Sequence, residues 1–143
     1  MPTAPQRRVV FIDDEKPYNA LMRQLLTDHF DCPVDAFLDP TTALAALPSL
    51  NPAVVVTDYF MPDLNGLELI RRATPLVPAT AFVLISGNNL SAEQEAMDRL
   101  PALKGFLPKP FGWRTLADEI LRVWPATCVR PSPTGGLSPN GKS

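Results

Sequence analysis

The chain has 143 residues, of which 45% are hydrophobic, and a formal net charge of −2 at pH 7. This length fits one domain with one core, and the small charge argues against nucleic-acid binding by this chain alone. The two cysteines form no metal-spaced or disulfide pattern, and no segment resembles a signal peptide or a membrane span, so we expect a cytoplasmic protein without membrane contact.

Short apolar runs alternate along the chain with segments whose apolar residues recur at helical spacing. The runs predict five strands, at residues 9–13, 34–38, 53–58, 81–86 and 104–108. The segments that follow them predict helices, at residues 17–30, 41–47, 67–73, 91–100 and 113–124. Asp39 and Pro40 suit a helix N-cap and first turn. Pro48 is expected to end that helix, and Ser91 with Gln94 has the spacing of a capping box.

Strands that alternate with helices predict an α/β fold, in which right-handed crossovers join the strands of a parallel sheet. Five units suit a flavodoxin-like, doubly wound (βα)5 sheet with strand order 2-1-3-4-5, and they are too few for an eightfold barrel. The domain is expected to span residues 8–124, after a loose lead-in at residues 1–7. Residues 125–143 are dominated by Pro, Gly, Ser and Thr, which predicts a disordered tail or a linker.

Polar residues stand at the ends of four of the predicted strands. Asp13 and Asp14 lie at the end of the first strand, Asp58 ends the third, Ser86 ends the fourth, and Lys109 follows the fifth. Ligands of an open α/β sheet bind at the carboxyl ends of its strands, so these side chains are expected to meet at one edge. Three crowded carboxylates favour a hard cation such as Mg²⁺. A carboxylate can also attack phosphorus to give an aspartyl phosphate, beside which Lys109 would add a positive charge.

Taken together, these residues resemble the response-regulator receiver domain of the CheY-like superfamily. The resemblance covers about residues 8–124 and rests on Asp13-Asp14, on Asp58-Tyr59-Phe60-Met61-Pro62 with Gly66 following, on Ser86, and on Lys109-Pro110. It implies a phosphoacceptor in a two-component signalling system. Such a domain assists its own phosphorylation and dephosphorylation, but it is not a free-standing enzyme.

The resemblance also implies a role for each residue of the acidic site. Asp58 is implied to be the phospho-acceptor and, with Asp13 and Asp14, to hold Mg²⁺. Phe60, two residues past the acceptor, would lend its backbone carbonyl to the metal. Lys109 matches the invariant cation of the family, and the peptide bond that follows it is cis in many members.

A second group of residues matches the switch positions of similar receivers. Ser86 looks like the hydroxyl that moves to meet the phosphoryl group, although Gly87 follows it where alanine is more frequent. Phe106 takes the position of the aromatic switch, where tyrosine is frequent. Phe60 and Asn88 match the two variable positions that flank the site, and we expect them to tune the lifetime of the phosphoryl group.

The implied partners are a sensor histidine kinase or a histidine phosphotransfer protein. A homodimer or an effector is expected on the face formed by the fourth helix, fifth strand and fifth helix. Trp113 and Trp124 are interpreted as core contacts, with a partner surface as the alternative.

Two other function classes are alternatives to the receiver: a Mg²⁺-dependent phosphohydrolase with an aspartyl-phosphate intermediate, and a flavodoxin-like module that binds a nucleotide or flavin. Phe60 stands where such phosphohydrolases commonly have a second acid, and Asp13-Asp14-Glu15 would repel a phosphate without a metal.

Overall fold

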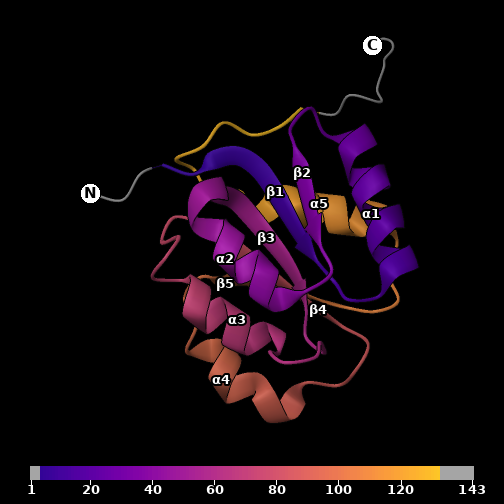
Figure 1. The fold of residues 1–143 in the computed structure, drawn as a ribbon, viewed down its shortest axis with the longest axis vertical. Helices are drawn as coiled ribbons and strands as arrows, with labels where there is room; N and C mark the ends of the chain where they lie inside the picture. The colour runs from indigo at the N-terminus through magenta and orange to yellow at the C-terminus, as the bar shows by residue number, and fades with distance from the viewer. Residues whose placement is uncertain (1–3, 133–143) are drawn as a thin grey trace.

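The structure is a computed structural model, and it describes residues 4–132. These residues form a parallel sheet of five strands in the order β2-β1-β3-β4-β5 (Figure 1), which confirms the predicted fold class and strand order. The strands are β1 (Gln6–Ile12), β2 (Val34–Phe37), β3 (Pro52–Asp58), β4 (Ala81–Ser86) and β5 (Leu103–Pro108). The helices are α1 (Lys16–His29), α2 (Pro40–Leu50), α3 (Gly66–Ala73), α4 (Gln94–Asp98) and α5 (Trp113–Val123), with a 3₁₀ turn, η1 (Ser91–Glu93), before α4.

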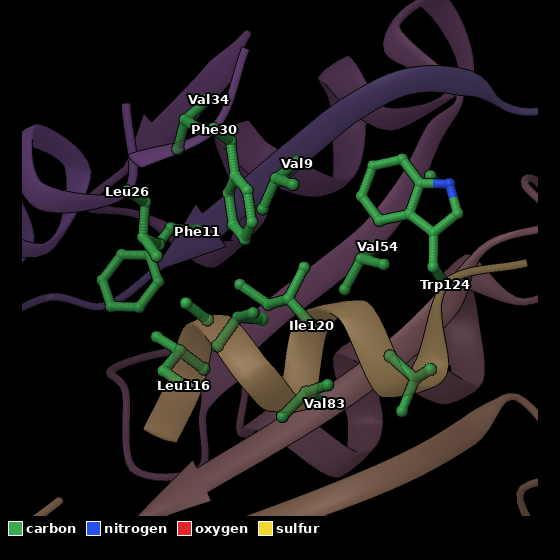
Figure 2. Close-up of a cluster of buried hydrophobic side chains, with 14 of the residues drawn as sticks. Val9, Phe11, Leu26, Phe30, Val34, Val54, Val83, Leu116, Ile120 and Trp124 are labelled. Carbon is green, nitrogen blue, oxygen red and sulfur yellow. The ribbon is translucent and has the colours of Figure 1, made fainter. Parts of the chain in front are cut away.

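Helices cover both faces of the sheet (Figure 1), because the central strands are apolar on both sides. In β1, Val9 and Phe11 belong to a core on the side of α1 and α5, whereas Val10 and Ile12 belong to a second core on the side of α2, α3 and α4. Figure 2 shows the first core, where Ile120 of α5 lies among side chains of the central strands. Packing on both faces therefore holds the central strands in place, and with them the starting points of the loops at the carboxyl edge of the sheet.

The end of α2 differs from its prediction. Asp39 caps the helix as expected, because its carboxylate accepts a hydrogen bond from the Thr42 N–H at 3.0 Å. Pro48, however, lies inside the helix, which continues to Leu50. A proline removes the hydrogen bond to the residue four positions earlier, and here that loss falls in the last turn, which the fully buried Leu47 holds against the core. The expectation that Pro48 ends the helix is therefore wrong.

The segment before β5 also differs from its prediction. Ser91 begins the 3₁₀ turn η1 instead of capping an α-helix, and its N–H donates to the Asn89 side chain at 2.8 Å. Burial of Leu90 fixes the start of this turn, and the Glu93 N–H donates to the Leu90 carbonyl at 2.9 Å, in the pattern of a 3₁₀ helix. The following α4 has only five residues. The capping-box interpretation of Ser91 with Gln94 is therefore wrong.

The folded part of the chain extends further at both ends than the sequence predicted. β1 begins at Gln6, so the last residues of the expected lead-in belong to the sheet. Beyond α5, residues 125–132 run back across the amino end of the sheet (Figure 1, yellow), and we call this segment the C-terminal strap. The sequence predicted a disordered tail or a linker from residue 125 onward, and the strap is the part of that segment that the structure describes. The remainder of the predicted lead-in and tail, residues 1–3 and 133–143, lies outside the described residues.

The strap is joined to the turn after α1 by hydrogen bonds in both directions. The Asp31 N–H donates to the Ser132 carbonyl at 3.0 Å, and the Ser132 N–H donates to Asp31 Oδ1 at 2.7 Å. Arg7, at the start of β1, forms an ion pair with the Asp31 carboxylate and donates to the Arg130 carbonyl at 3.4 Å. These contacts use main-chain groups and charged side chains, so a segment poor in large apolar residues can still be held.

The strap also closes the first core at its amino end. Trp124 is 7% exposed, and its indole Nε1 donates to the Cys128 carbonyl at 3.1 Å. Pro131 is buried, and Cys128 packs against the same core that contains Cys32. Trp113 at the other end of α5 is partly buried and meets His29 edge-on, with the ring centroids 5.2 Å apart. Both tryptophans therefore make core contacts.

The outer strand β5 is irregular and covered by side chains of α5. The pairing with β4 passes from Leu103 to Gly105, which leaves Lys104 as an extra residue. Arg122 donates to the Lys104 carbonyl at 2.8 Å and to Glu119 at 2.6 Å. A Cβ at Gly105 would lie 2.1 Å from Glu119 Oε2, so the absence of a side chain at this position is what lets Glu119 lie across the strand.

Over residues 4–132, the helices are all too short or too polar to cross a bilayer. The cytoplasmic location stays a prediction.

Candidate functional site

The carboxyl ends of β1 and β3 lie side by side, because the two strands are paired in register as far as Ile12 and Thr57. Asp13 and Asp14 follow Ile12, and Asp58 follows Thr57. One carboxylate oxygen from each of these three acids lies within 4.8 Å of the other two. The structure thus brings together the three carboxylates that the sequence predicted at one edge.

Asp13 is the most enclosed of the three acids, with 0% of the residue exposed. Its Oδ1 accepts a hydrogen bond from the Glu15 N–H at 2.8 Å, and its own N–H donates to the Phe37 carbonyl at 3.1 Å. Asp58 is 8% exposed, whereas Asp14 is open to solvent. The site therefore has two enclosed carboxylates and one that faces water.

Lys109 lies across this cluster from the end of β5. Its Nζ is 3.1 Å from Asp13 Oδ2 and 3.7 Å from Asp58 Oδ1. The backbone N–H of Lys109 donates to the Ser86 carbonyl at 2.8 Å, which connects the lysine to the end of β4. The Lys109–Pro110 peptide bond is cis. One ammonium therefore faces both enclosed carboxylates.

The electrostatics of the cluster raise the pKa of Asp58 to about 6. Burial is the main cause, since it disfavours the charged carboxylate, and the neighbouring Asp13 carboxylate adds to the effect. The Lys109 ammonium and the Tyr59 N–H, which donates to Asp58 Oδ1 at 3.0 Å, lower the pKa and only partly offset these causes. Asp58 is thus a carboxylate in a site with too little positive charge to balance its acids.

Ser86, at the end of β4, is fully buried and bonded to its own loop. Its Oγ accepts a hydrogen bond from the Asn88 N–H at 3.0 Å and lies 3.3 Å from the Asn88 carbonyl. A Cβ at Gly87 would be 3.9 Å from the Lys109 Cβ, so the glycine lies close to the lysine stem. The hydroxyl predicted to act as a switch is in this structure held by Asn88.

The two phenylalanines singled out from the sequence occupy different surroundings. Phe106 is partly buried and packs against the core on the side of α4. Phe60 is 52% exposed, and its ring meets the Tyr59 ring edge-on with centroids 4.7 Å apart. Phe60 therefore presents an apolar side chain to solvent directly after the acid site.

Sequence reasoning missed two residues of the site, both in the first turn of α1. Tyr18 places its ring under the Lys109 ammonium, with Nζ 4.7 Å from the ring centroid. Asn19 is buried, and its side-chain amide donates to the carbonyls of Asp13 and Phe37, each at 2.8 Å. A signal for Asn19 was present, because it lies three and seven residues before Met22 and Leu26 and is therefore a polar residue on the apolar face of the helix.

The comparisons with known proteins decide the family. The model of the response regulator receiver domain matches residues 9–121, which is most of the chain. The chain belongs to the response regulator receiver family. The family places this receiver in two-component signalling.

Several relatives and solved structures resemble the receiver. The protein-glutamate methylesterase/protein-glutamine glutaminase 2 of Burkholderia thailandensis is 34% identical over 95 residues, which are 65% of this chain and 26% of that protein. The transcriptional regulatory protein TrcR of Mycobacterium tuberculosis is 30% identical over 120 residues, or 79% of this chain and 43% of that protein. The receiver therefore spans less than half the length of these curated relatives.

The chemotaxis protein CheY4 of Vibrio cholerae has a similar fold, with a TM-score of 0.74 at 22% identity over 82% of this chain and 98% of that chain. At this identity the likeness concerns the fold alone. It agrees with the order and direction of the five strands described above.

The acid cluster of the receiver is suited to a hard divalent cation. Its donors are carboxylate oxygens from Asp13, Asp14 and Asp58, and such cations prefer oxygen ligands. Burial is the largest cause of the raised pKa of Asp58, and repulsion by the carboxylates of Asp13 and Asp14 adds to it. A cation between the acids would relieve that repulsion. The donor set and the charge of the cluster therefore both fit a bound metal.

Proposed function

We propose that this receiver accepts a phosphoryl group on Asp58 from the phosphohistidine of a sensor histidine kinase or a histidine phosphotransfer protein. The observation that carries the proposal is the grouping of Asp13, Asp14 and Asp58 with Lys109 3.1 Å from Asp13 and 3.7 Å from Asp58. A carboxylate nucleophile beside a cation is the arrangement that this transfer needs.

In the proposed transfer, an oxygen of the Asp58 carboxylate attacks the phosphorus, the new O–P bond forms, and the P–N bond to the donor histidine breaks. The electron pair of that bond stays with the imidazole, which takes up a proton. Lys109 faces the phosphoryl oxygens and stabilises their charge. Asp13, Asp14, Asp58 and the backbone carbonyl of Phe60 would hold Mg²⁺, which neutralises phosphoryl charge when bound.

The same proposal gives Ser86 and Phe106 a role as a switch. Ser86 Oγ would exchange its bond with Asn88 for one to the phosphoryl group on Asp58, which pulls the loop after β4. Phe106, partly buried beside α4, would change its packing as that loop moves. The surface formed by α4, β5 and α5 would then engage a second copy of the receiver or an effector.

Phe60 and Asn88 are proposed to set how long the phosphoryl group lasts. Phe60 is exposed next to the acceptor, and the Asn88 N–H donates to the switch serine. Side chains at these two positions would affect how easily a water reaches the phosphoryl group. Exchanging Phe60 for a small polar residue is expected to change the rate of phosphate release. An equal rate in the variant would contradict this role.

The proposal is tested by intact-mass analysis after incubation with acetyl phosphate or phosphoramidate and Mg²⁺. The wild type is expected to gain one phosphoryl group, and Asp58→Asn or chelation of the metal is expected to prevent it. Asp118→Asn, which makes the same change on the exposed surface of α5, is the matched control and is expected to behave like the wild type. A wild type that is unmodified by any donor would contradict the proposal.

A further inference from the structure

The ammonium of Lys109 is surrounded by two carboxylates and one aromatic ring. Nζ lies 3.1 Å from Asp13 and 3.7 Å from Asp58, and the ring centroid of Tyr18 is 4.7 Å away. A cation at this distance from a ring face is attracted by the electron-rich face. Of the two carboxylates, Asp13 accepts a hydrogen bond from the lysine and Asp58 lies just beyond hydrogen-bond distance. The ring attracts the ammonium without accepting a hydrogen bond.

The Tyr18 ring is itself held firmly. It packs against Phe11 of β1, with centroids 6.2 Å apart and an angle of 50° between the ring planes. The next residue, Asn19, is buried and donates to the carbonyls of Asp13 and Phe37. The first turn of α1 is thereby bound to the loop that carries Asp13, so the ring and the acid keep a fixed relation.

The hydroxyl of Tyr18 stays neutral beside these acids. Burial and the carboxylates of Asp13 and Asp58 raise its pKa to about 12. The tyrosine therefore adds no negative charge that would compete with Asp58 for the lysine, and its contribution comes from the ring face.

We propose that Tyr18 is a positioning residue for phosphoryl transfer, which holds the Lys109 ammonium over the site while leaving its N–H groups available to phosphoryl oxygens. Without the ring, the lysine side chain is freer to turn away from the acids into solvent. There its ammonium would give less stabilisation to the charge on the phosphoryl group. This inference rests on the proposed function of the site.

The test compares variants at position 18 by the rate constant of phosphorylation at saturating Mg²⁺ and acetyl phosphate. Tyr18→Phe keeps the ring and is expected to remain within twofold of the wild type, whereas Tyr18→Leu is expected to be about threefold to tenfold slower. Phenylalanine analogues with one to three ring fluorines at this position keep the shape and weaken the negative ring face, so the rate is expected to fall with each fluorine. A rate that is independent of fluorination would overturn the proposal.

Two further measurements separate positioning from a merely structural effect. In the Lys109→Met background, Tyr18→Leu is expected to cause no additional loss, and an equal loss there would overturn the proposal. By NMR, the methylene protons of Lys109 are expected to show an upfield ring-current shift in the wild type and in Tyr18→Phe that is lost in Tyr18→Leu. An absent shift in the wild type would also overturn the proposal, whether or not the chain is phosphorylated.

The outcomes distinguish this inference from the proposed function. A phosphorylated wild type with an equally fast Tyr18→Leu variant would overturn the role of Tyr18 alone. A wild type that shows the ring-current shift but is modified by no donor would overturn phosphoryl transfer at Asp58, and the positioning role with it.

Discussion

At the carboxyl edge of the sheet three carboxylates lie close together beside one ammonium, whereas at the amino edge the C-terminal strap exchanges hydrogen bonds with Asp31 and accepts one from Arg7. Asp13 and Asp58 are enclosed with only Lys109 between them, and the pKa of Asp58 is raised as a result. Asp31 at the other edge accepts from Arg7 and from the Ser132 N–H.

The two edges differ in their electrostatics, because unfavourable repulsion between acids is concentrated at the carboxyl edge. Crowded acids destabilise the fold, but a cation bound between them would relieve their repulsion, and the proposed phosphoryl transfer would use the same site. The strap contributes stability and takes no part in that chemistry. Changes at the amino edge should therefore alter stability alone, and changes at the carboxyl edge should alter stability and phosphorylation together.

Removal of the strap is the change with the largest expected effect. A chain that ends at Trp124 loses the indole hydrogen bond, the burial of Pro131 and the bonds to Asp31, and we expect it to lose about 3 kcal/mol of the free energy of unfolding. Urea denaturation measures this loss. A chain that ends at Ser132 keeps all these contacts and is the control, and an equal midpoint for the two chains would contradict a stabilising role of the strap.

At the carboxyl edge, Gly66→Ala is expected to be costly because the backbone there is closely packed. A Cβ at Gly66 would lie 2.5 Å from the Asp58 carbonyl oxygen and 2.7 Å from a methyl of Leu84. We expect a loss of about 2–3 kcal/mol in stability, together with slower phosphorylation as Asp58 shifts. Gly112→Ala is the matched control, since a Cβ there meets nothing within 4 Å. Equal phosphorylation in both variants would contradict the expected shift of Asp58.

Asp58→Asn is expected to stabilise the metal-free protein at neutral pH while it abolishes phosphorylation. The folded-state pKa of Asp58 is raised to about 6, from about 4 in an unfolded chain. The folded protein therefore binds the proton more tightly, so stability falls as the pH rises from about 4 to about 6, and the full penalty remains above pH 6.

Urea denaturation in the presence of a chelator measures this effect. The variant should exceed the wild type by up to about 2 kcal/mol at pH 7 and by nothing near pH 4. Asp118→Asn provides the comparison on an exposed surface. A variant that is less stable than the wild type at pH 7 would mean that the acid cluster is balanced without a metal.

The smallest expected effect belongs to Asp31→Ala at the amino edge. This change removes the ion pair with Arg7 and the acceptor for the Ser132 N–H, and it should cost about 1 kcal/mol. Asp31→Asn keeps an oxygen acceptor and should cost less. Phosphorylation is expected to be unchanged in both variants, and the wild-type advantage over Asp31→Asn should shrink in high salt.

The carboxyl edge was largely predictable from the sequence, because each of its residues stands directly at the end of an apolar run. Strand order alone then brings Asp13 beside Asp58. The surroundings of the site were harder to foresee. The contact between Tyr18 and Lys109 joins two elements far apart in the chain, and no pattern near either residue predicts it.

The strap could not be predicted from local composition. Its stability comes from partners distant in sequence, such as Arg7 and Asp31 for Arg130 and Ser132. Composition reports how much apolar surface a segment can bury, and by that measure residues 125–132 resemble a linker. The errors at Pro48 and Ser91 have a similar origin, since packing of Leu47 and Leu90 outweighed the local signals.

Both outer strands of the sheet are poor templates for the addition of another strand. In β5, Lys104 interrupts the regular pairing with β4, and the Lys104 carbonyl accepts a hydrogen bond from Arg122. The side chain of Glu119 covers Gly105. β2 at the opposite edge has only four residues and carries the charged Asp35. Short, irregular and charged edges resist edge-to-edge aggregation. Proteins that bind this domain must therefore recognise its side chains and helices, because its backbone leaves little room for an intruding strand.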